Sequence, residues 1–151
     1  MKPFIAAITA AALALPVTAS AQSIENAIDA RQGQFQIMQL NIAILGGMAR
    51  GRVDYDATLA QQAADNLVSI SMLHPAPFWP AGSDNATVDG TRALPAIWEN
   101  LGDVVGIWGQ FGEAAVALQA VAGDGQAALG PALGPVGATC SACHDNYRAS
   151  R

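Results

Sequence analysis

Apolar residues recur along the first part of the chain at the spacing of a helix that lies against a core. From Ser23 onward they follow one another at alternating steps of about three and four residues. This spacing places them on one helical face. The stripe consists of Ile24, Ile28, Phe35, Met38, Ile42, Leu45 and Ala49, with Arg31 in a slot where an apolar residue is expected. Ser23 is suited to cap the helix. The pattern predicts a long bundle helix that ends near Gly51.

Two further stretches show the same period. One begins at the N-cap candidate Asp56 and ends near Leu73, and the other runs from Pro95 or Asn100 to Ala122. Their stripes are Leu59, Ala63, Leu67, Ile70 and Leu73, and then Val104, Ile107, Phe111, Ala114, Leu118 and Val121. The second of these helices contains the glycines Gly102, Gly106, Gly109 and Gly112. Each glycine costs about 1 kcal/mol relative to alanine, and close approach by another helix would explain them.

Residues 74–95 separate these two helices and contain four prolines and two glycines. A connection this long is uncommon in compact domains and is often functional. A fourth helix is predicted after the break at residues 122–125. Pro131 and Pro135 disfavour a helix interior, so either Pro131 lies in the first turn or the helix kinks. Because no segment alternates with period two for long, the predicted fold is all-α, an antiparallel four-helix bundle with a long loop between helices two and three.

The N-terminus has the pattern of a secretory signal peptide rather than of a folded element. Lys2 precedes an apolar run, and Ala19, Ser20 and Ala21 form a small-x-small cleavage pattern. The run is short for a membrane span, which disfavours the alternative of a membrane anchor. We therefore predict a signal peptide over residues 1–21 and an exported, periplasmic domain over residues 22–151.

Composition narrows the partners of this domain. The chain has a net charge of −5 and no basic run, so nucleic acid is not an expected partner. No later stretch has the length of uninterrupted apolar sequence that a bilayer requires, so the mature form is not expected to enter a membrane. Export to an oxidising compartment would allow its two cysteines to pair as a disulfide.

Both cysteines lie in the C-terminal segment Cys140-Ser141-Ala142-Cys143-His144. A zinc site would need four ligands, and only His74 remains. A redox pair of this spacing belongs to a βαβ unit, which the pattern lacks, and a disulfide would close almost no loop. Covalent haem attachment fits better. On a helix, Cys143 and His144 lie three and four residues from Cys140 on one face, so two thiols meet the haem vinyl groups while the imidazole meets the iron.

The first helix offers candidates for the other side of a haem. Arg31 either snorkels from a partly exposed site or pairs with a carboxylate such as a haem propionate, with Gln32 adding a hydrogen bond. Phe35, one turn on, is either ordinary core or a side chain over the iron that cannot ligate it. Met38 is either core or a sixth ligand. His74 is expected to face solvent.

The segments ARQGQF, YDA, FWPAG, AIW, AGDG and TCSACHDNYR together resemble the cytochromes c′ of bacteria across the whole mature chain. The prolines of helix four, and one extra residue before Cys140, depart from the family pattern. The resemblance implies a four-helix bundle, usually a homodimer, with one high-spin haem c. It assigns the following roles: Cys140 and Cys143 as thioether sites, His144 as proximal ligand, Arg31 and Gln32 on the propionate side, Phe35 as distal blocking residue, Thr91 and Arg92 along the haem edge, and Arg148 near the proximal imidazole.

The function expected from these features is binding rather than catalysis. A five-coordinate iron would bind NO and CO, with a part in electron transfer through an unknown redox partner. The resemblance also implies that NO can replace His144. The alternative is a low-spin electron carrier with Met38 as second axial ligand. A peroxidase-like enzyme would need a distal acid–base residue, which the stripe of the first helix does not supply.

Overall fold

The computed structural model describes residues 18–150, with side chains from Ser23 onward. Nearly all of the predicted signal peptide therefore lies outside the described residues. The elements in chain order are α1 (Thr18–Ala49), α2 (Ala57–Ser71), the short 3₁₀ helix η1 (Ala76–Phe78), α3 (Ala96–Glu99), α4 (Leu101–Gln119) and α5 (Gln126–Tyr147). No strand is present among these residues, where one isolated β-bridge joins Ala93 to Arg148. The all-α prediction is confirmed.

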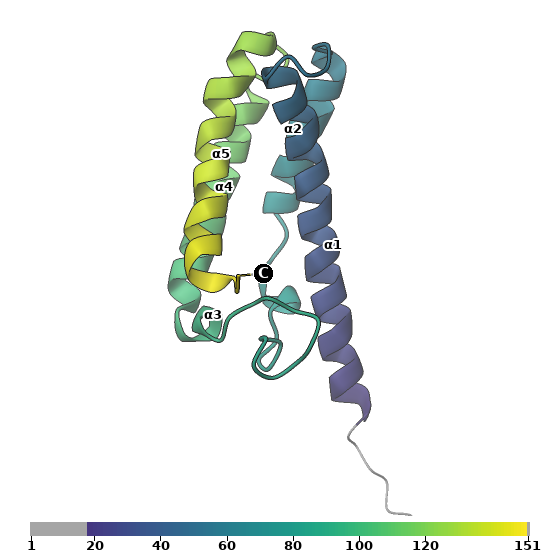
Figure 1. The fold of residues 1–151 in the computed structure, drawn as a ribbon, viewed down its shortest axis with the longest axis vertical. Coiled ribbons are helices and arrows are strands. Elements are labelled where there is room, and N and C mark those ends of the chain that lie inside the picture. Colours follow the sequence, from purple (N-terminus) through teal and green to yellow (C-terminus); the bar gives the residue numbers. More distant parts are fainter. Residues whose placement is uncertain (1–17, 151) are drawn as a thin grey trace, which may run out of the picture.

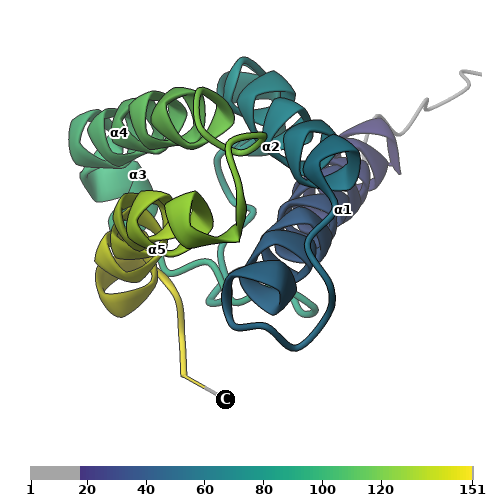
Figure 2. The ribbon, with the colours of Figure 1, turned by 90° about the horizontal axis from the view of Figure 1, so that it is seen from above.

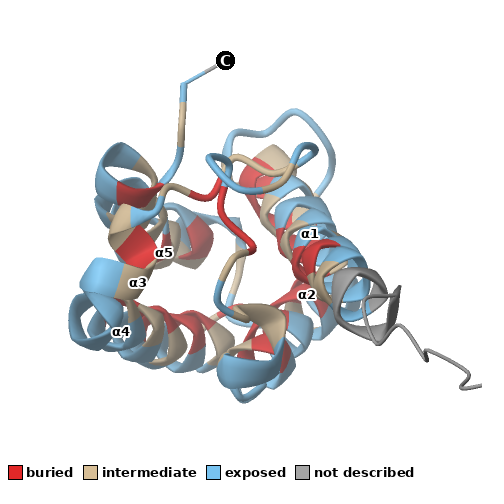
Figure 3. Ribbon diagram, turned by 90° about the horizontal axis from the view of Figure 1, so that it is seen from below, coloured by how far each residue is buried: buried red, intermediate tan, exposed pale blue. Residues whose placement is uncertain are grey.

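The four long helices form a ring (Figure 1, Figure 2). Helix α1 packs on α2 and α5, and α4 packs on the same two helices. The buried segments lie on the sides that face one another, and the exposed segments face outward (Figure 3). The long loop crosses one end of the bundle beside the C-terminus of α5 (Figure 1). This arrangement is the predicted four-helix bundle. Within residues 18–150, no helix combines the length and hydropathy that crossing a membrane requires.

Local signals in the sequence explain how the helices begin and end. Helix α1 ends at a glycine turn, in which Gly51 has a φ of 63° and donates its N–H to the Met48 carbonyl at 2.9 Å. The predicted N-cap Asp56 accepts the N–H of Leu59 at 2.9 Å. Tyr55 donates its hydroxyl to the Ala122 carbonyl at 2.8 Å, so the α1–α2 and α4–α5 connections are joined at the same end of the bundle.

Helix α5 excludes one of the two alternatives predicted for Pro131, a place in the first turn. Pro131 is the sixth residue of the helix rather than part of its first turn, and Pro135 lies one turn further inside. Both side chains are exposed, so the missing N–H bonds are on the solvent side, where water can satisfy the unpaired carbonyls. The helix continues through both prolines to Tyr147 (Figure 1).

The explanation offered for the α4 glycines is also wrong for three of them. A Cβ at Gly102, Gly106 or Gly109 would meet nothing within 4 Å, so no helix approaches there. Only Gly112 has a neighbour, the Ser71 hydroxyl at 3.4 Å. The glycine content of the outer face of α4 has no structural reason that we can identify.

The buried faces follow the predicted stripes with two exceptions on α2. Leu59 is 40% exposed and Leu73 is 42% exposed. The packed face of α2 includes the small residues Ala60, Ala63 and Ala64, which are almost completely buried. Leu73 lies beyond the end of the helix, so the helical period no longer places it on that face.

The core consists of two clusters. The main cluster includes Met38, Leu45, Leu67 and Leu118 between the long helices, and Phe35 packs against it. A smaller cluster at the α3 end is formed by Ala93, Ile97, Ile107 and Tyr147, with Trp79, Trp98 and Cys143 packed against it. Each predicted site residue can be located relative to these two clusters.

Candidate functional site

The two thiols and the imidazole lie on the last two turns of α5. Cys140 and Cys143 are free and half-buried, and His144 is half-buried as well. Their spacing on a continuous helix is the one predicted for covalent haem attachment. Within the described residues, no group of three or more His, Cys, Asp or Glu side chains could hold a metal ion, so the zinc alternative has no further ligands there.

The pKa shifts of His144 and of the two cysteines also suit the attachment of a haem. Burial lowers the pKa of His144, and the charges of Arg148 and Arg92 lower it further, so the neutral imidazole that can ligate iron is favoured. Burial likewise raises the pKa of Cys140 and of Cys143, which keeps both as thiols. Two uncommitted thiols and one neutral imidazole on a single helical face therefore fit the demands of haem c.

The C-terminal end of α5 is tied to the long loop by a short pairing that we call the terminal bridge, residues 92–94 against 147–149. The Leu94 N–H donates to the Tyr147 carbonyl at 3.0 Å, and the Ala149 N–H donates to the Arg92 carbonyl at 2.9 Å. The Arg92 side chain also donates to the Ala149 carbonyl through Nε, at 2.9 Å. Arg92 and the exposed Arg148 both lie close enough to His144 for their charges to lower its pKa. The roles that the resemblance gives them, Arg92 along the haem edge and Arg148 near the proximal imidazole, stay predictions.

Tyr147 adds a side-chain link between α5 and α4. Its buried hydroxyl donates to Oδ2 of Asp103 at 2.6 Å. This hydrogen bond raises the pKa of Tyr147, with burial and the Asp103 charge adding to the effect. Tyr147 follows His144 by three residues, so this link fixes the turn that carries the imidazole.

Arg31 is buried, with 3% of its surface exposed. The snorkelling alternative is therefore wrong. Nη1 donates to the Phe78 carbonyl at 3.2 Å and to Ser83 Oγ at 3.0 Å, while Nη2 donates to the Ser83 carbonyl and to Thr91 Oγ1, both at 2.9 Å. All four hydrogens of these two nitrogens point to loop oxygens. Only the Nε hydrogen is left for a propionate in this arrangement, in place of the bidentate contact considered from the sequence.

Gln32 and Thr91 also take part in the hydrogen bonds that hold the long loop on α1. The exposed Gln32 donates from Nε2 to the Gly90 carbonyl at 2.7 Å. The half-buried Thr91 accepts from Arg31 and also from the Ala93 N–H, at 3.2 Å. Arg31 and Gln32 therefore hold the loop on α1, while Arg92 and its neighbours hold the next part of it on the end of α5.

Phe35 and Met38 lie one turn apart on α1 and both pack in the main cluster, and the Phe35 ring also meets Trp79. Phe35 is half-buried, and its ring lies edge-on to Trp79 with the centroids 6.4 Å apart. Trp79 belongs to the smaller cluster, which also includes Cys143. Met38 is 6% exposed and lies inside the main cluster. His74 is exposed, as predicted.

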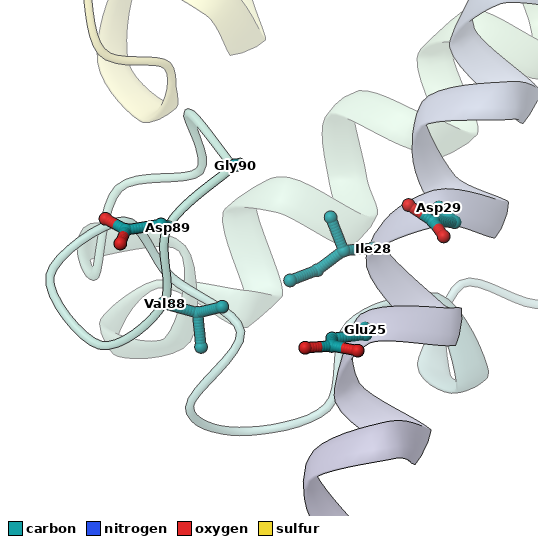
Figure 4. A pocket seen from close by; sticks show the side chains of 6 residues that line it. All are labelled: Glu25, Ile28, Asp29, Val88, Asp89 and Gly90. Atoms are coloured by element: carbon teal, nitrogen blue, oxygen red, sulfur yellow. The ribbon is translucent and has the colours of Figure 1, made fainter.

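A surface pocket of about 340 Å³ lies between α1 and the loop (Figure 4). Its lining is formed by Glu25, Ile28, Asp29, Val88, Asp89 and Gly90. In Figure 4, Ile28 extends from α1 toward the loop, while the Asp89 side chain, on the loop, points away from α1. The pocket adjoins the Gln32–Gly90 hydrogen bond and shares no residue with the Cys140–His144 segment.

Two parts of this site were missed by sequence reasoning. Trp79 was visible only as a letter of the FWPAG motif, and its position between Phe35 and Arg31 depends on how the loop folds back. The Tyr147–Asp103 hydrogen bond joins residues 44 apart in the chain. The one available signal was that Tyr147 shares a helical face with His144.

Comparisons with known proteins agree with the geometry. The chain matches the family model described as cytochrome c′ over residues 26–148. A cytochrome c′ from Cereibacter sphaeroides is 38% identical over 138 residues, covering 91% of this chain and 93% of the relative.

Solved structures of similar proteins give the same result. The cytochrome c′ from Rhodobacter Spheriodes superposes with a TM-score of 0.82 at 37% identity, covering 85% of this chain and 98% of that chain. A cytochrome c′ described as having an unusual ligand-controlled dimer dissociation superposes with a TM-score of 0.77 at 30% identity, covering 84% and 97%.

Proposed function

Because the chain belongs to the cytochrome c′ family and carries haem c covalently through Cys140 and Cys143, we propose that it binds small uncharged gases, NO and CO, at a five-coordinate iron. His144 is the single protein ligand in this proposal. A haem iron with an open coordination position supplies the gas-binding chemistry. The chain's own residues decide which molecules reach that position and in what state the imidazole is held.

The observation that carries the proposal is the position of Phe35. It packs against the main cluster and lies edge-on to Trp79, which, like Cys143, packs against the smaller cluster, and a phenyl ring offers no atom that can ligate iron. The ring excludes water and anions by its bulk and its apolar character, whereas an uncharged diatomic needs little space and no hydrogen bonds. His144 is held neutral by burial and by two nearby arginine charges, which suits it to be the proximal ligand.

The alternative is a low-spin electron carrier with Met38 as second axial ligand. Met38 is 6% exposed and is buried inside the main cluster, which also includes Leu45 and Leu67. Bringing its sulfur to an iron held by α5 would require part of that packing to be opened. The packing of Met38 therefore favours the five-coordinate proposal, and electron transfer remains a second role that does not need Met38.

Optical spectroscopy of the purified ferric protein tests this choice. We expect a high-spin spectrum that changes when NO is added and that is the same in Met38→Leu. A methionine-type charge-transfer band that disappears in Met38→Leu would establish the alternative instead.

The attachment of haem can be checked separately by intact mass. The protein should exceed its apo mass by one haem, and a variant with both Cys140→Ala and Cys143→Ala should lack that added mass. Covalent haem that tolerates loss of both thiols would refute the attachment.

The cellular setting follows from the same assignment. Residues 1–21 are proposed to be removed as a signal peptide, which places the mature protein in the periplasm. A homodimer is proposed as its assembly, in line with the similar structure described by its dimer dissociation. Exposed apolar side chains on the outer side of α1 and at the start of α2, including Ile37, Leu40 and Leu59, offer a surface for it.

A further inference from the structure

Trp79 stands directly beside the residue that the proposed function places over the iron. Its ring meets Phe35 at an interplanar angle of 66°, with the centroids 6.4 Å apart. This edge-on arrangement is a favourable one for two aromatic rings. Phe35 is only half-buried, so its freedom to swing depends on the neighbours that stand around it. Among the described aromatic side chains, Trp79 is the one whose ring pairs with Phe35.

Trp79 is itself held from several directions. The Arg31 guanidinium lies over its ring at 4.4 Å from the centroid. Trp98 packs on it edge-on at 6.1 Å, and Nε1 of Trp98 donates to the Trp79 carbonyl at 3.2 Å. Arg31 is fixed in turn by its four hydrogen bonds to the loop. These contacts hold the Trp79 indole in place, so it is not free to move together with the Phe35 ring.

We propose that Trp79 is a positioning residue that holds Phe35 in its blocking place and thereby sets the rate at which gases reach the iron. The inference rests on the proposed function, in which an entering gas must displace the Phe35 ring. A displaced ring loses its contact with Trp79 before any new contact forms, so that contact is part of the entry barrier. Trp79 acts through Phe35 and touches no reacting atom.

Trp108 provides a matched control. It is also half-buried, it packs on an aromatic neighbour, Phe111, at 5.2 Å, and its Nε1 donates to a backbone carbonyl, that of Ser71, at 3.1 Å. It lies on α4, which does not pack directly on α1, the helix of Phe35. Trp108→Leu therefore removes a similar side chain from a helix that does not pack on α1, and the ring of Trp108 pairs with Phe111 rather than with Phe35.

The test is the rate of CO association with the ferrous holoprotein, measured by flash photolysis. We expect Trp79→Leu to raise this rate about three- to tenfold, the range that loss of one aromatic pair contact corresponds to. Trp79→Phe keeps a ring with shorter reach and should give a smaller increase. Trp108→Leu should leave the rate within about twofold of the parent, because its ring does not pair with Phe35.

A double-mutant cycle with Phe35→Ala identifies the route of the effect. Phe35→Ala alone should accelerate CO association, and adding Trp79→Leu to it should then change the rate by less than about twofold. An equal effect of Trp79→Leu with and without Phe35 would overturn the positioning role, and so would equal rates in Trp79→Leu and Trp108→Leu. No acceleration in Phe35→Ala itself would instead overturn the proposed distal block, so the two failures are told apart.

Trp79→Phe protects the experiment against a folding failure. If Trp79→Leu does not yield folded holoprotein, the cycle is run with Trp79→Phe, which retains the aromatic packing on Trp98 and Arg31. An unchanged rate in that variant, with Phe35→Ala accelerated, would count against the inference.

Discussion

Arg31 shows how far one side chain can organise a segment that is remote in sequence. Its two terminal nitrogens bond to oxygens of residues 78, 83 and 91, and its charged face covers the ring of Trp79. A guanidinium suits this work because its donors are planar and point in fixed directions. The residue that interrupts the apolar stripe of α1 is thus the one that holds the long loop on that helix.

The first prediction concerns this fastening. Arg31→Met should lower the free energy of unfolding by about 2–4 kcal/mol, because four loop oxygens lose a charged donor in a buried place. Chemical denaturation of the holoprotein measures it. Gln32→Ala, which removes one exposed hydrogen bond to the same loop, should cost under about 1 kcal/mol. Equal costs for the two variants would mean that Arg31 does not secure the loop.

At the scale of elements, the C-terminal end of α5 depends on its partners more than on its own helix-forming residues. Two prolines and several glycines weaken α5 internally. The helix is nonetheless held at its end by the terminal bridge to residues 92–94 and by the hydrogen bond from Tyr147 to Asp103 of α4. The turn that carries the two cysteines and His144 is therefore positioned by contacts with the loop and with α4.

The Tyr147–Asp103 link predicts a dependence on alkaline pH. The pKa of Tyr147 is raised above its ordinary value because the hydroxyl donates to Asp103 in the folded state. The folded state therefore favours the neutral phenol, so the contribution to stability is complete below about pH 10 and is lost as the pH rises through the raised pKa. The difference in Tm between the parent and Tyr147→Phe should accordingly shrink as the pH is taken above 10.

Asp103→Asn serves as the control for this prediction. It keeps an acceptor for the hydroxyl but removes the charge that opposes the phenolate, so the alkaline loss should begin at a lower pH than in the parent. A Tm difference between the parent and Tyr147→Phe that stays constant through alkaline pH would show that the hydrogen bond contributes nothing to the pH dependence.

At the scale of the whole molecule, the outer surface exposes apolar side chains on more than one side of the bundle. Ile37 is 51% exposed, Leu40 is 61% exposed and Val53 is 53% exposed on the side formed by α1 and the start of α2. An open, largely apolar pocket, bordered by Ile44, Val53 and Leu59, lies on the same side. Helix α4 carries exposed apolar residues as well, Leu101 at 47%, Val105 at 52% and Val116 at 50%.

We expect the proposed dimer to use the side formed by α1 and the start of α2, where the apolar pocket lies, and this can be measured. Leu40→Glu should raise the dimer dissociation constant at least about thirtyfold, because a charge would be buried at the centre of an apolar contact. Sedimentation equilibrium measures the change. Val116→Glu on α4 is the matched control and should leave assembly unaltered. Dissociation caused by Val116→Glu alone would place the interface on the other side of the bundle.

Much of the fold could be predicted because each helix carries local information. The period of apolar residues, the N-cap Asp56 and the glycine breaks act within a few residues of chain, so α2, α4 and the end of α1 were predicted close to their observed limits. The predicted N-cap Ser23 is wrong, because α1 already begins at Thr18 and runs through Ser23. The errors arose where the packing of a neighbouring element decides which residues of a helix are buried. Leu59 lies outside the packed face because α2 buries Ala60, Ala63 and Ala64 instead, and the tolerance for Pro131 depends on that part of α5 facing solvent.

By itself, the sequence determined the helical class, the family resemblance and the covalent attachment motif, because helical period and the spacing of Cys140, Cys143 and His144 are local properties. The burial of Arg31 and its bonds to the loop were decided only by the tertiary structure, as were the wall that Trp79 forms beside Phe35 and the link from Tyr147 to Asp103. These contacts join residues that lie 44 or more positions apart. Their partners depend on how the long loop folds back across the bundle, which no local pattern encodes.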